Sequence, residues 1–197
     1  MKNKLKKSLK IGKAAARLFN RKGYLETNMD HIAAAAKMSK GGVYHYFSSK
    51  DEILYFILSN FIDLILNDLE SDLKKIEGAS PKIKYIISRH VDLYIANLAE
   101  SKTALHEAHC LPAKYFKKIA EKERTYYGIV SDVLSEFLGD QPENGNGKAR
   151  SLSFLLFGMC NWIYSWYNPK GPVSPKELSE LMWTVFLEGI GECRAKI

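Results

Sequence analysis

Apolar residues recur at spacings of three and four along almost the whole chain, and no stretch combines sustained alternation with tight-turn residues. This periodicity predicts an all-α protein of about nine helices. Glycine and proline mark several of the helix ends, and a glycine- and asparagine-rich loop is predicted at 139–147. The predicted helices span residues 5–22, 29–36, 40–47, 50–77, 81–100, 101–110, 112–138 and 148–167, with a ninth opening at Ser174.

The second and third predicted helices are short and lie next to each other in the sequence. Thr27 is placed to cap the first of them and Ser39 to cap the second. Helices this short need neighbours to be stable. The second one carries Lys40, Tyr44 and His45. Two short helices joined by a tight turn, with basic and aromatic side chains on the second, predict a helix-turn-helix for the DNA major groove.

The excess positive charge is confined to the segment that contains this motif. Residues 1–52 hold twelve Lys and Arg against four Asp and Glu, which is +8, whereas residues 53–197 hold seventeen against eighteen, which is −1. A phosphate-binding surface needs such an asymmetry. The alternative is a basic N-terminal tail without a function.

At these residues the chain resembles the N-terminal domain of TetR-type transcriptional repressors, over residues 9–57 without a gap. The resemblance implies a DNA-binding domain at 1–48 and a helical ligand-binding and dimerisation domain at 49–197. It departs from the family at Lys37, where the turn usually has a glycine. The resemblance is carried by residues 14–19, Gly23, Tyr24, Thr27, 30–33 and 39–54.

The resemblance also implies which residues contact DNA. The family positions that commonly touch DNA correspond here to Thr27, Lys40, Tyr44, His45 and Lys50. Gly41 and Gly42, in the first turn of the recognition helix, weaken that helix but allow the backbone to approach DNA closely. The expected partner is a double-stranded, palindromic operator bound by a homodimer.

The last two predicted helices expose more apolar surface than one small core needs. The eighth is apolar on nearly every side, and the ninth carries an i, i+3, i+4 stripe. We expect the two helices to form a dimer interface, the alternative being that the stripe packs only inside its own subunit. The expected interface residues are Leu178, Leu181, Met182, Val185 and Phe186.

Aromatic residues are abundant on the inner helices and could wall a pocket with few polar groups, or could be simple core. Residues 157–172 are similar to the C-terminal helices of TetR-type regulators of fatty acid and steroid degradation that respond to acyl-CoA. The expected effector is therefore a largely apolar molecule such as an acyl-CoA, with Arg89 among the candidates to meet its phosphates. The expected pocket residues are Tyr94, His109, Tyr126, Phe154, Phe157, Asn161 and Trp162.

Other classes of function have less support. His106, Glu107 and His109, which His90 could join from the preceding helix, are the only cluster resembling metal ligands. Cys110 is adjacent but points elsewhere on a helix, so neither a metal nor another cofactor is expected. No phosphate loop or nucleophile motif indicates an enzyme. The long uncharged run 151–168 is better explained as a buried helix than as a membrane span, and three cysteines without pairing fit a cytoplasmic protein. A multidrug-sensing repressor, and a helical carrier or enzyme with an incidental basic N-terminus, are the alternatives.

Overall fold

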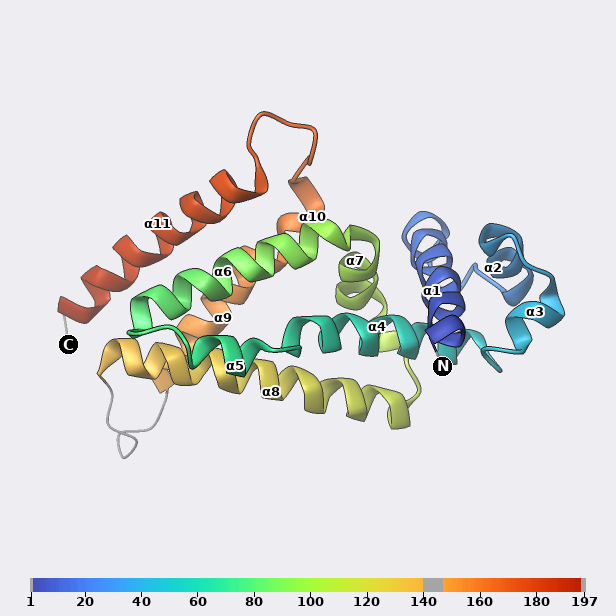
Figure 1. The fold of residues 1–197 in the computed structure, drawn as a ribbon, viewed down its shortest axis with the longest axis horizontal. Helices are drawn as coiled ribbons and strands as arrows, with labels where there is room; N and C mark the ends of the chain where they lie inside the picture. Colours follow the sequence, from blue (N-terminus) through green and yellow to red (C-terminus); the bar gives the residue numbers. More distant parts are fainter. Residues whose placement is uncertain (1, 140–146, 196–197) are drawn as a thin grey trace. The chain divides into compact units, whose positions relative to one another are not determined.

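The computed structural model describes residues 2–139 and 147–195, and every regular element in these two stretches is a helix (Figure 1). The all-α prediction is therefore confirmed for this part of the chain. None of the helices in the same residues has the length and apolar character that a membrane span requires. The loop predicted at 139–147 lies, apart from the glycines at its two ends, outside the described residues.

The first of two compact units comprises residues up to 64 together with 97–123. Its core lies where α1, α2, α3 and α4 bring their apolar faces together; Ile11, Phe19, Ile32, Val43 and Leu54 are all at most 1% exposed. Its elements are α1 (Lys2–Lys22), α2 (Met29–Ala36), α3 (Lys40–Tyr44), most of α4 (Lys50–Leu66), α7 (Leu98–Glu107), η1 (Ala108–Cys110) and the first part of α8 (Ala113–Leu138).

The second compact unit comprises residues 65–96 and the chain from 124 onward. Ile83, Ile87, Leu134 and Leu156 are at most 1% exposed and form the centre of its core. Helix α11 packs along α6 (Figure 1). The elements of this unit are α5 (Leu69–Leu73), α6 (Ala79–Ala96), the rest of α8, α9 (Gly147–Asn161), α10 (Ile163–Trp166) and α11 (Pro175–Ala195).

Two of the predicted helices are each divided in the structure. The predicted helix at 50–77 is interrupted after Leu66, because Asp68 takes a left-handed backbone conformation with φ of +58°. Aspartate tolerates this conformation better than most residues. The predicted helix at 148–167 is divided at Trp162 into α9 and α10. These two breaks account for the difference from the predicted number of helices.

The helix caps follow the predicted residue types with two shifts of position. Ser174 and Glu177 form the reciprocal cap at the start of α11: the Glu177 amide donates to Ser174 Oγ at 3.2 Å and the Ser174 amide donates to Glu177 Oε2 at 2.8 Å. At α4 the Glu52 amide donates to Ser49 Oγ, but the carboxylate of Glu52 accepts from Ser48. The prediction that Thr27 caps α2 is wrong, since Asn28 occupies that position.

Each compact unit is built from two separate segments of the sequence, so no single residue divides the chain into the two units. The unit that holds α1–α3 also holds residues 49–64 and 97–123, so packing does not divide the chain at residue 48. The functional division into 1–48 and 49–197 stays a prediction.

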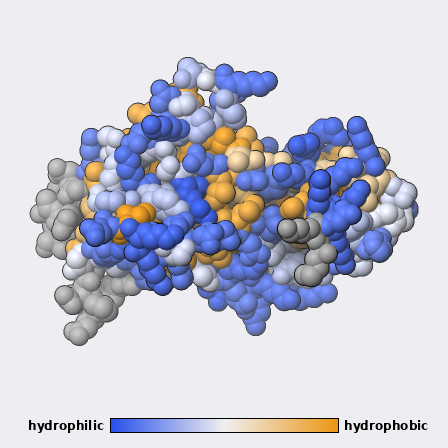
Figure 2. All heavy atoms as spheres, viewed as in Figure 1, coloured by the Kyte–Doolittle hydropathy of each residue, from blue (hydrophilic) through white to orange (hydrophobic). Residues whose placement is uncertain are grey.

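On the face shown in Figure 2, hydrophilic residues cover most of the surface and hydrophobic residues form patches between them.

Candidate functional site

The predicted recognition segment is a short capped helix. The Gly42 amide donates to Ser39 Oγ at 3.1 Å, which satisfies one of the free N–H groups of the first turn of α3. A Cβ atom at Gly42 would lie 3.0 Å from the same oxygen, whereas one at Gly41 would meet nothing within 4 Å. Glycine at position 42 thus makes room for the cap, and Gly41 leaves the backbone open to an approaching molecule.

One face of this segment is buried in the core and the other is exposed to solvent. Val43 and Phe47 are at most 4% exposed and hold the segment against the other helices of the unit. Tyr44 is 46% exposed and His45 is also exposed, so both rings are available for an external contact. A tyrosine combines an apolar ring with a polar hydroxyl, which suits it to an external contact.

Lys40 joins the two helices of the motif. Its Nζ lies 2.9 Å from Asp30 Oδ1, and both side chains are 60% exposed. The hydrogen bond to Asp30 raises the pKa of Lys40, so the ammonium stays charged at any physiological pH. The pair is exposed enough that a phosphate can compete with Asp30 for the lysine.

Two of the predicted DNA contacts have other partners in the structure. Thr27 is 1% exposed and its hydroxyl donates to the Gly23 carbonyl at 2.8 Å, so its side chain supports the chain between α1 and α2 instead of facing outward. Lys50 is half-buried, donates to the Tyr24 carbonyl at 2.7 Å and lies 4.2 Å from the centre of the Tyr24 ring. Both residues hold the same connecting segment in place.

The turn between α2 and α3 has Lys37 at the position where the family usually has a glycine, and it still adopts the left-handed conformation that a glycine would favour. Lys37 is left-handed, with φ of +54° and ψ of +51°, and the Met38 amide after it donates to the Ala33 carbonyl at 3.0 Å. This is the usual glycine-type end of a helix, formed here with a lysine. The glycine-type helix end is therefore formed by a lysine at the cost of backbone strain.

Four of the predicted pocket residues come together inside the second unit, around a histidine that was not predicted. Tyr94 stacks on the His90 ring with 4.0 Å between ring centres, and Tyr94 donates to Asn161 Oδ1 at 2.8 Å. Tyr126 and Phe157 close the other sides, with their rings 5.1 Å apart.

His90 is 2% exposed, and burial lowers its pKa to about 3, so the ring is neutral at physiological pH. Its Nδ1 lies 3.0 Å from the Tyr126 hydroxyl. Nε2 makes no hydrogen bond of good geometry with the described residues, although the nearby Asn161 side chain partly offsets the lowering of the pKa. A buried polar atom without a partner costs about 1–3 kcal/mol. The histidine was missed because it was weighed only as a metal ligand.

The remaining predicted pocket residues lie elsewhere. Phe154 and Trp162 are 52% and 61% exposed and face outward from α9 and the turn that follows it. His109 is an exposed residue of the first unit, with its Nε2 3.4 Å from Cys110 Sγ. In the described part of the chain, no three His, Cys, Asp or Glu residues are grouped as a metal site would require.

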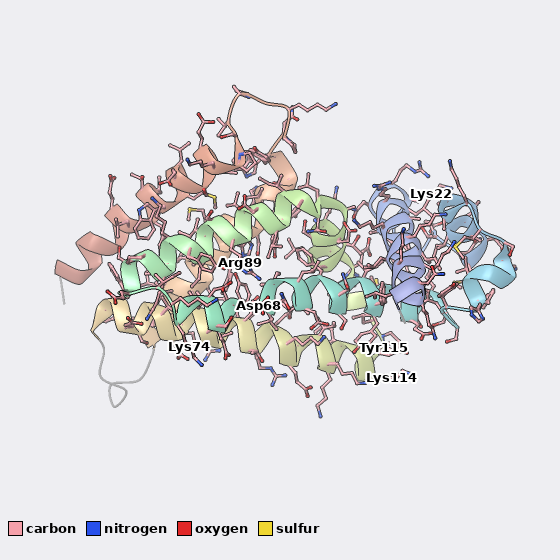
Figure 3. The ribbon with its side chains drawn as sticks, viewed as in Figure 1. Lys22, Asp68, Lys74, Arg89, Lys114 and Tyr115 are labelled. Atoms are coloured by element: carbon pink, nitrogen blue, oxygen red, sulfur yellow. The ribbon has the colours of Figure 1, made fainter. Side chains whose placement is uncertain are left out.

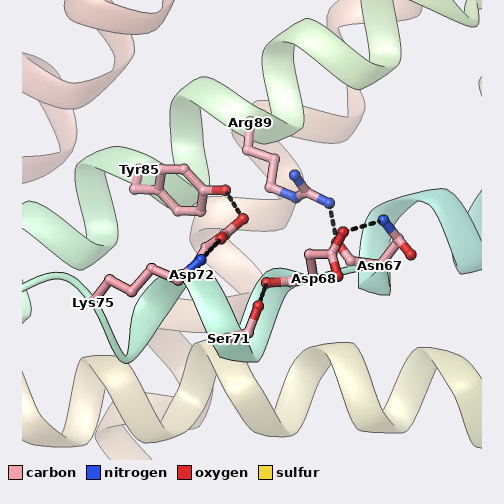
Figure 4. A network of polar contacts seen from close by, with 7 residues as sticks. All are labelled: Asn67, Asp68, Ser71, Asp72, Lys75, Tyr85 and Arg89. Carbon is pink, nitrogen blue, oxygen red and sulfur yellow. Dashed lines mark hydrogen bonds and ion pairs between the residues drawn. The ribbon is translucent and has the colours of Figure 1, made fainter.

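Arg89, a predicted phosphate ligand, is engaged at the break between α4 and α5 (Figure 4). It donates from α6 to the carbonyls of Ile65 and Asn67, which are left without helical partners where α4 ends. Beside it, Asp72 accepts from Tyr85 at 2.8 Å. Arg89 thus holds the end of α4 in place and is not a free cation.

The predicted dimer stripe divides into two faces. Leu178, Met182 and Phe186 are at most 9% exposed, so the prediction that they form an intersubunit surface is corrected: they pack within their own unit. Leu181 and Val185 are 57% and 65% exposed. Together with four residues of α9, α10 and the turn between them, they are the strongly exposed large apolar side chains in the described part of the second unit. The four are Phe154, Leu155, Trp162 and Trp166.

Comparison with known proteins places both parts of the chain. Residues 11–55 match the bacterial regulatory proteins of the tetR family, and residues 77–190 match the tetracyclin repressor-like C-terminal domain. A TetR-family transcriptional regulator from Bordetella parapertussis 12822 has a similar crystal structure, with a TM-score of 0.85, 30% identity, and coverage of 91% of this chain and 93% of that chain.

Two further proteins are similar to this chain, one in sequence and one in fold. The fatty acid metabolism regulator protein of Bacillus subtilis (strain 168) is 26% identical over 136 residues, which is 69% of this chain and 70% of that protein. AibR, in a crystal structure with isovaleryl coenzyme A and operator DNA, has the same fold, with a TM-score of 0.77 and 24% identity over 91% of this chain and 97% of that chain.

Proposed function

Because the chain belongs to the TetR family of transcriptional regulators, we propose that it represses transcription as a homodimer on a palindromic operator and is released by a largely apolar effector. The chain is a DNA-binding regulator with a ligand-binding domain, not an enzyme. Regulators of this family bind operator DNA as dimers. The operator contacts, the dimer surface and the effector are what the proposal adds.

We assign base recognition to Tyr44 and His45. Both are exposed on a segment whose buried residues, Val43 and Phe47, fix its orientation. Lys40 contributes a phosphate or base contact in exchange for its ion pair with Asp30. Thr27 and Lys50 act indirectly, because they brace the segment between α1 and α2.

We assign the dimer surface to the exposed apolar residues of α9–α11. Leu181 and Val185 on α11 expose more than half of their side chains, as do Trp162 and Trp166. Six large apolar side chains on consecutive helices are more than a monomeric surface usually presents together. Covering them with a second copy is the simplest way to remove them from water.

The buried environment of His90 is the observation that carries the effector assignment. Its Nε2 makes no hydrogen bond of good geometry with the described residues, and its neighbours Tyr94, Tyr126 and Phe157 are aromatic. A molecule with a long apolar part and one carbonyl or hydroxyl group would satisfy both demands. A fatty acyl-CoA has this character, and the names of the Bacillus subtilis relative and of the AibR complex point to the same class.

The test is calorimetry and operator release with three ligands: a long-chain acyl-CoA, the corresponding free fatty acid and a planar cationic drug. We expect the thioester to bind and to release operator DNA, by binding one of two protein conformations more tightly. Release by the drug alone would make the protein a multidrug sensor and would contradict the thioester assignment. A protein that binds ligand but shows no specific operator shift would be a carrier.

His90→Leu and Leu93→Ala provide the matched pair for this test. The first replaces the ring by an apolar side chain of similar reach and removes both ring nitrogens, and the second changes a half-buried neighbour on α6 that is not in the aromatic cluster. We expect acyl-CoA binding to weaken about tenfold in the first variant, the equivalent of one lost hydrogen bond to a neutral group. The second variant should bind nearly as the parent does.

A further inference from the structure

A surface groove with a volume of about 1060 Å³ runs between α1 and the C-terminal end of α2, inside the first compact unit. We call it the α1–α2 groove; Figure 1 shows the two helices side by side. The residues along its floor are small or aliphatic: Ala14 and Leu18 from α1, and Ala35 and Ala36 from α2. Tyr44 and His45 are not among the residues that line it.

One wall of the groove is a row of cations. Successive residues of a helix are rotated by about 100° and rise by about 1.5 Å, so these five side chains fall within a sector of about 80° and extend over about 22 Å. All five are exposed. They are Lys6, Lys10, Lys13, Arg17 and Arg21.

The charge of the groove is not compensated. Lys7 and Lys37 complete a set of seven cations, and no Asp or Glu lines the groove. Within the described residues none of the seven takes part in an ion pair, whereas Lys40 and Lys122 are each paired with an aspartate. Seven like charges at close range repel one another and favour an anionic partner.

We propose that the α1–α2 groove binds the phosphate backbone of operator DNA outside the bases that α3 reads. Lys37 lies both at the groove and in the turn that leads to α3, three residues before Lys40, so the groove adjoins the recognition segment. Duplex DNA carries a charge about every 1.7 Å along its axis and suits an extended row of cations. This inference rests on the proposed operator binding and adds a second contact to it.

The composition of the groove argues against a protein as the partner. Protein interfaces are anchored by large aromatic or aliphatic side chains that enter pockets. Here the floor is mostly alanine, and the long side chains are all cationic. Contacts of this kind bind phosphate without reading sequence.

The experiment compares two triple variants that remove the same charge from the same unit. The groove variant is Lys10→Gln, Lys13→Gln, Arg17→Gln. The control is Lys114→Gln, Lys117→Gln, Lys118→Gln, on exposed residues near the start of α8, where Figure 3 labels Lys114 and Tyr115. Binding is measured by fluorescence anisotropy on a duplex limited to the palindrome and on one with flanks of about one helical turn, between about 50 and 200 mM salt.

We expect the parent and the control to bind the flanked duplex more tightly than the short one, and the groove variant, which keeps four of the seven cations, to gain much less from the flanks. The salt slope on the flanked duplex should fall by about 0.9 for each lost phosphate contact, up to about 2.7 per protomer. Equal slopes for the two variants, or equal losses on the two duplexes, would overturn the proposal. So would a groove variant that keeps full DNA affinity but loses binding to polyglutamate, which would indicate an acidic protein partner.

The same data separate this proposal from the proposed function. Discrimination between the palindrome and a base-substituted duplex depends on α3 and should be unchanged in the groove variant. A parent protein that fails to discriminate would contradict the operator proposal itself. Circular dichroism and sedimentation of both triple variants would establish that fold and oligomeric state are intact.

Discussion

Replacing Lys37 by glycine should stabilise the protein, although the change removes a side chain. Lys37 ends α2 with φ of +54°, a left-handed conformation in which an L side chain is crowded against the backbone. Its side chain is exposed and makes no ion pair with a described residue. The substitution therefore removes strain without removing a contact.

The expected gain follows from two opposing terms. A left-handed conformation costs a residue with a Cβ about 1–2 kcal/mol, which glycine avoids. Glycine in turn loses about 0.5–1 kcal/mol more conformational freedom on folding. The net stabilisation should be about 0.5–1 kcal/mol. The same substitution at Ala35, an exposed helical position two residues earlier, should destabilise by about 1 kcal/mol.

Urea unfolding followed by circular dichroism, at one fixed protein concentration, measures both variants. Lys37→Ala is the control for charge, because it removes the ammonium but keeps the strain. We expect the midpoint to rise for Lys37→Gly, to fall for Ala35→Gly and to change little for Lys37→Ala. Equal destabilisation by both glycines would refute the strain argument, and a rise for Lys37→Ala would show that charge repulsion is the cause.

Further predictions concern the recognition segment, the dimer surface and His90. Tyr44→Ala should weaken operator binding by about 1–3 kcal/mol per half-site with the fold intact, and Gly41→Ala should weaken it with unchanged or greater stability; footprinting and thermal unfolding would test both. Val185→Glu should give monomers in sedimentation, because the new carboxylate would be buried unpaired in the dimer surface. The control Lys74→Glu, at the exposed residue after α5 that Figure 3 labels, should leave the dimer intact. A dimeric Val185→Glu variant would exclude the α9–α11 surface as the dimer interface. His90 takes up a proton near pH 6.5 in the unfolded chain but only near pH 3 in the folded protein. The free energy of unfolding should therefore fall by about 2 kcal/mol as the pH is lowered from 8 to 5. A His90→Leu variant with the same pH dependence would contradict this assignment.

The helix and the cap of the recognition segment could be predicted from the sequence, because the signals there are local. Ser39 three residues before Gly42, and Val43 and Phe47 four residues apart, determine a cap and a buried face without reference to the rest of the chain. The roles of Thr27 and Lys50 could not be predicted in this way. Their partners, Gly23 and Tyr24, lie on a connecting segment whose position depends on tertiary packing.

The second unit was harder to predict because its interactions join distant residues. Tyr94 and Asn161 are 67 positions apart, and no periodicity indicates that they share a hydrogen bond. The α11 stripe shows the same limit: its spacing indicates an apolar helix, but only packing against α6 separates the buried Met182 from the exposed Leu181. The break at Asp68 depends equally on Arg89, more than twenty residues away.

The positions of Arg89 and His90 on α6 have a consequence for how a ligand signal would travel. Arg89 holds the carbonyls at the end of α4, and the next residue is the buried histidine of the aromatic cluster. A helix turn is stiff, so a ligand that displaces the backbone at His90 also displaces the peptide that carries Arg89. Arg89 and His90 are separated by one peptide bond, and most of α4 belongs to the first compact unit. By linkage, operator DNA that favours one position of α4 changes effector affinity by the same factor as the effector changes operator affinity.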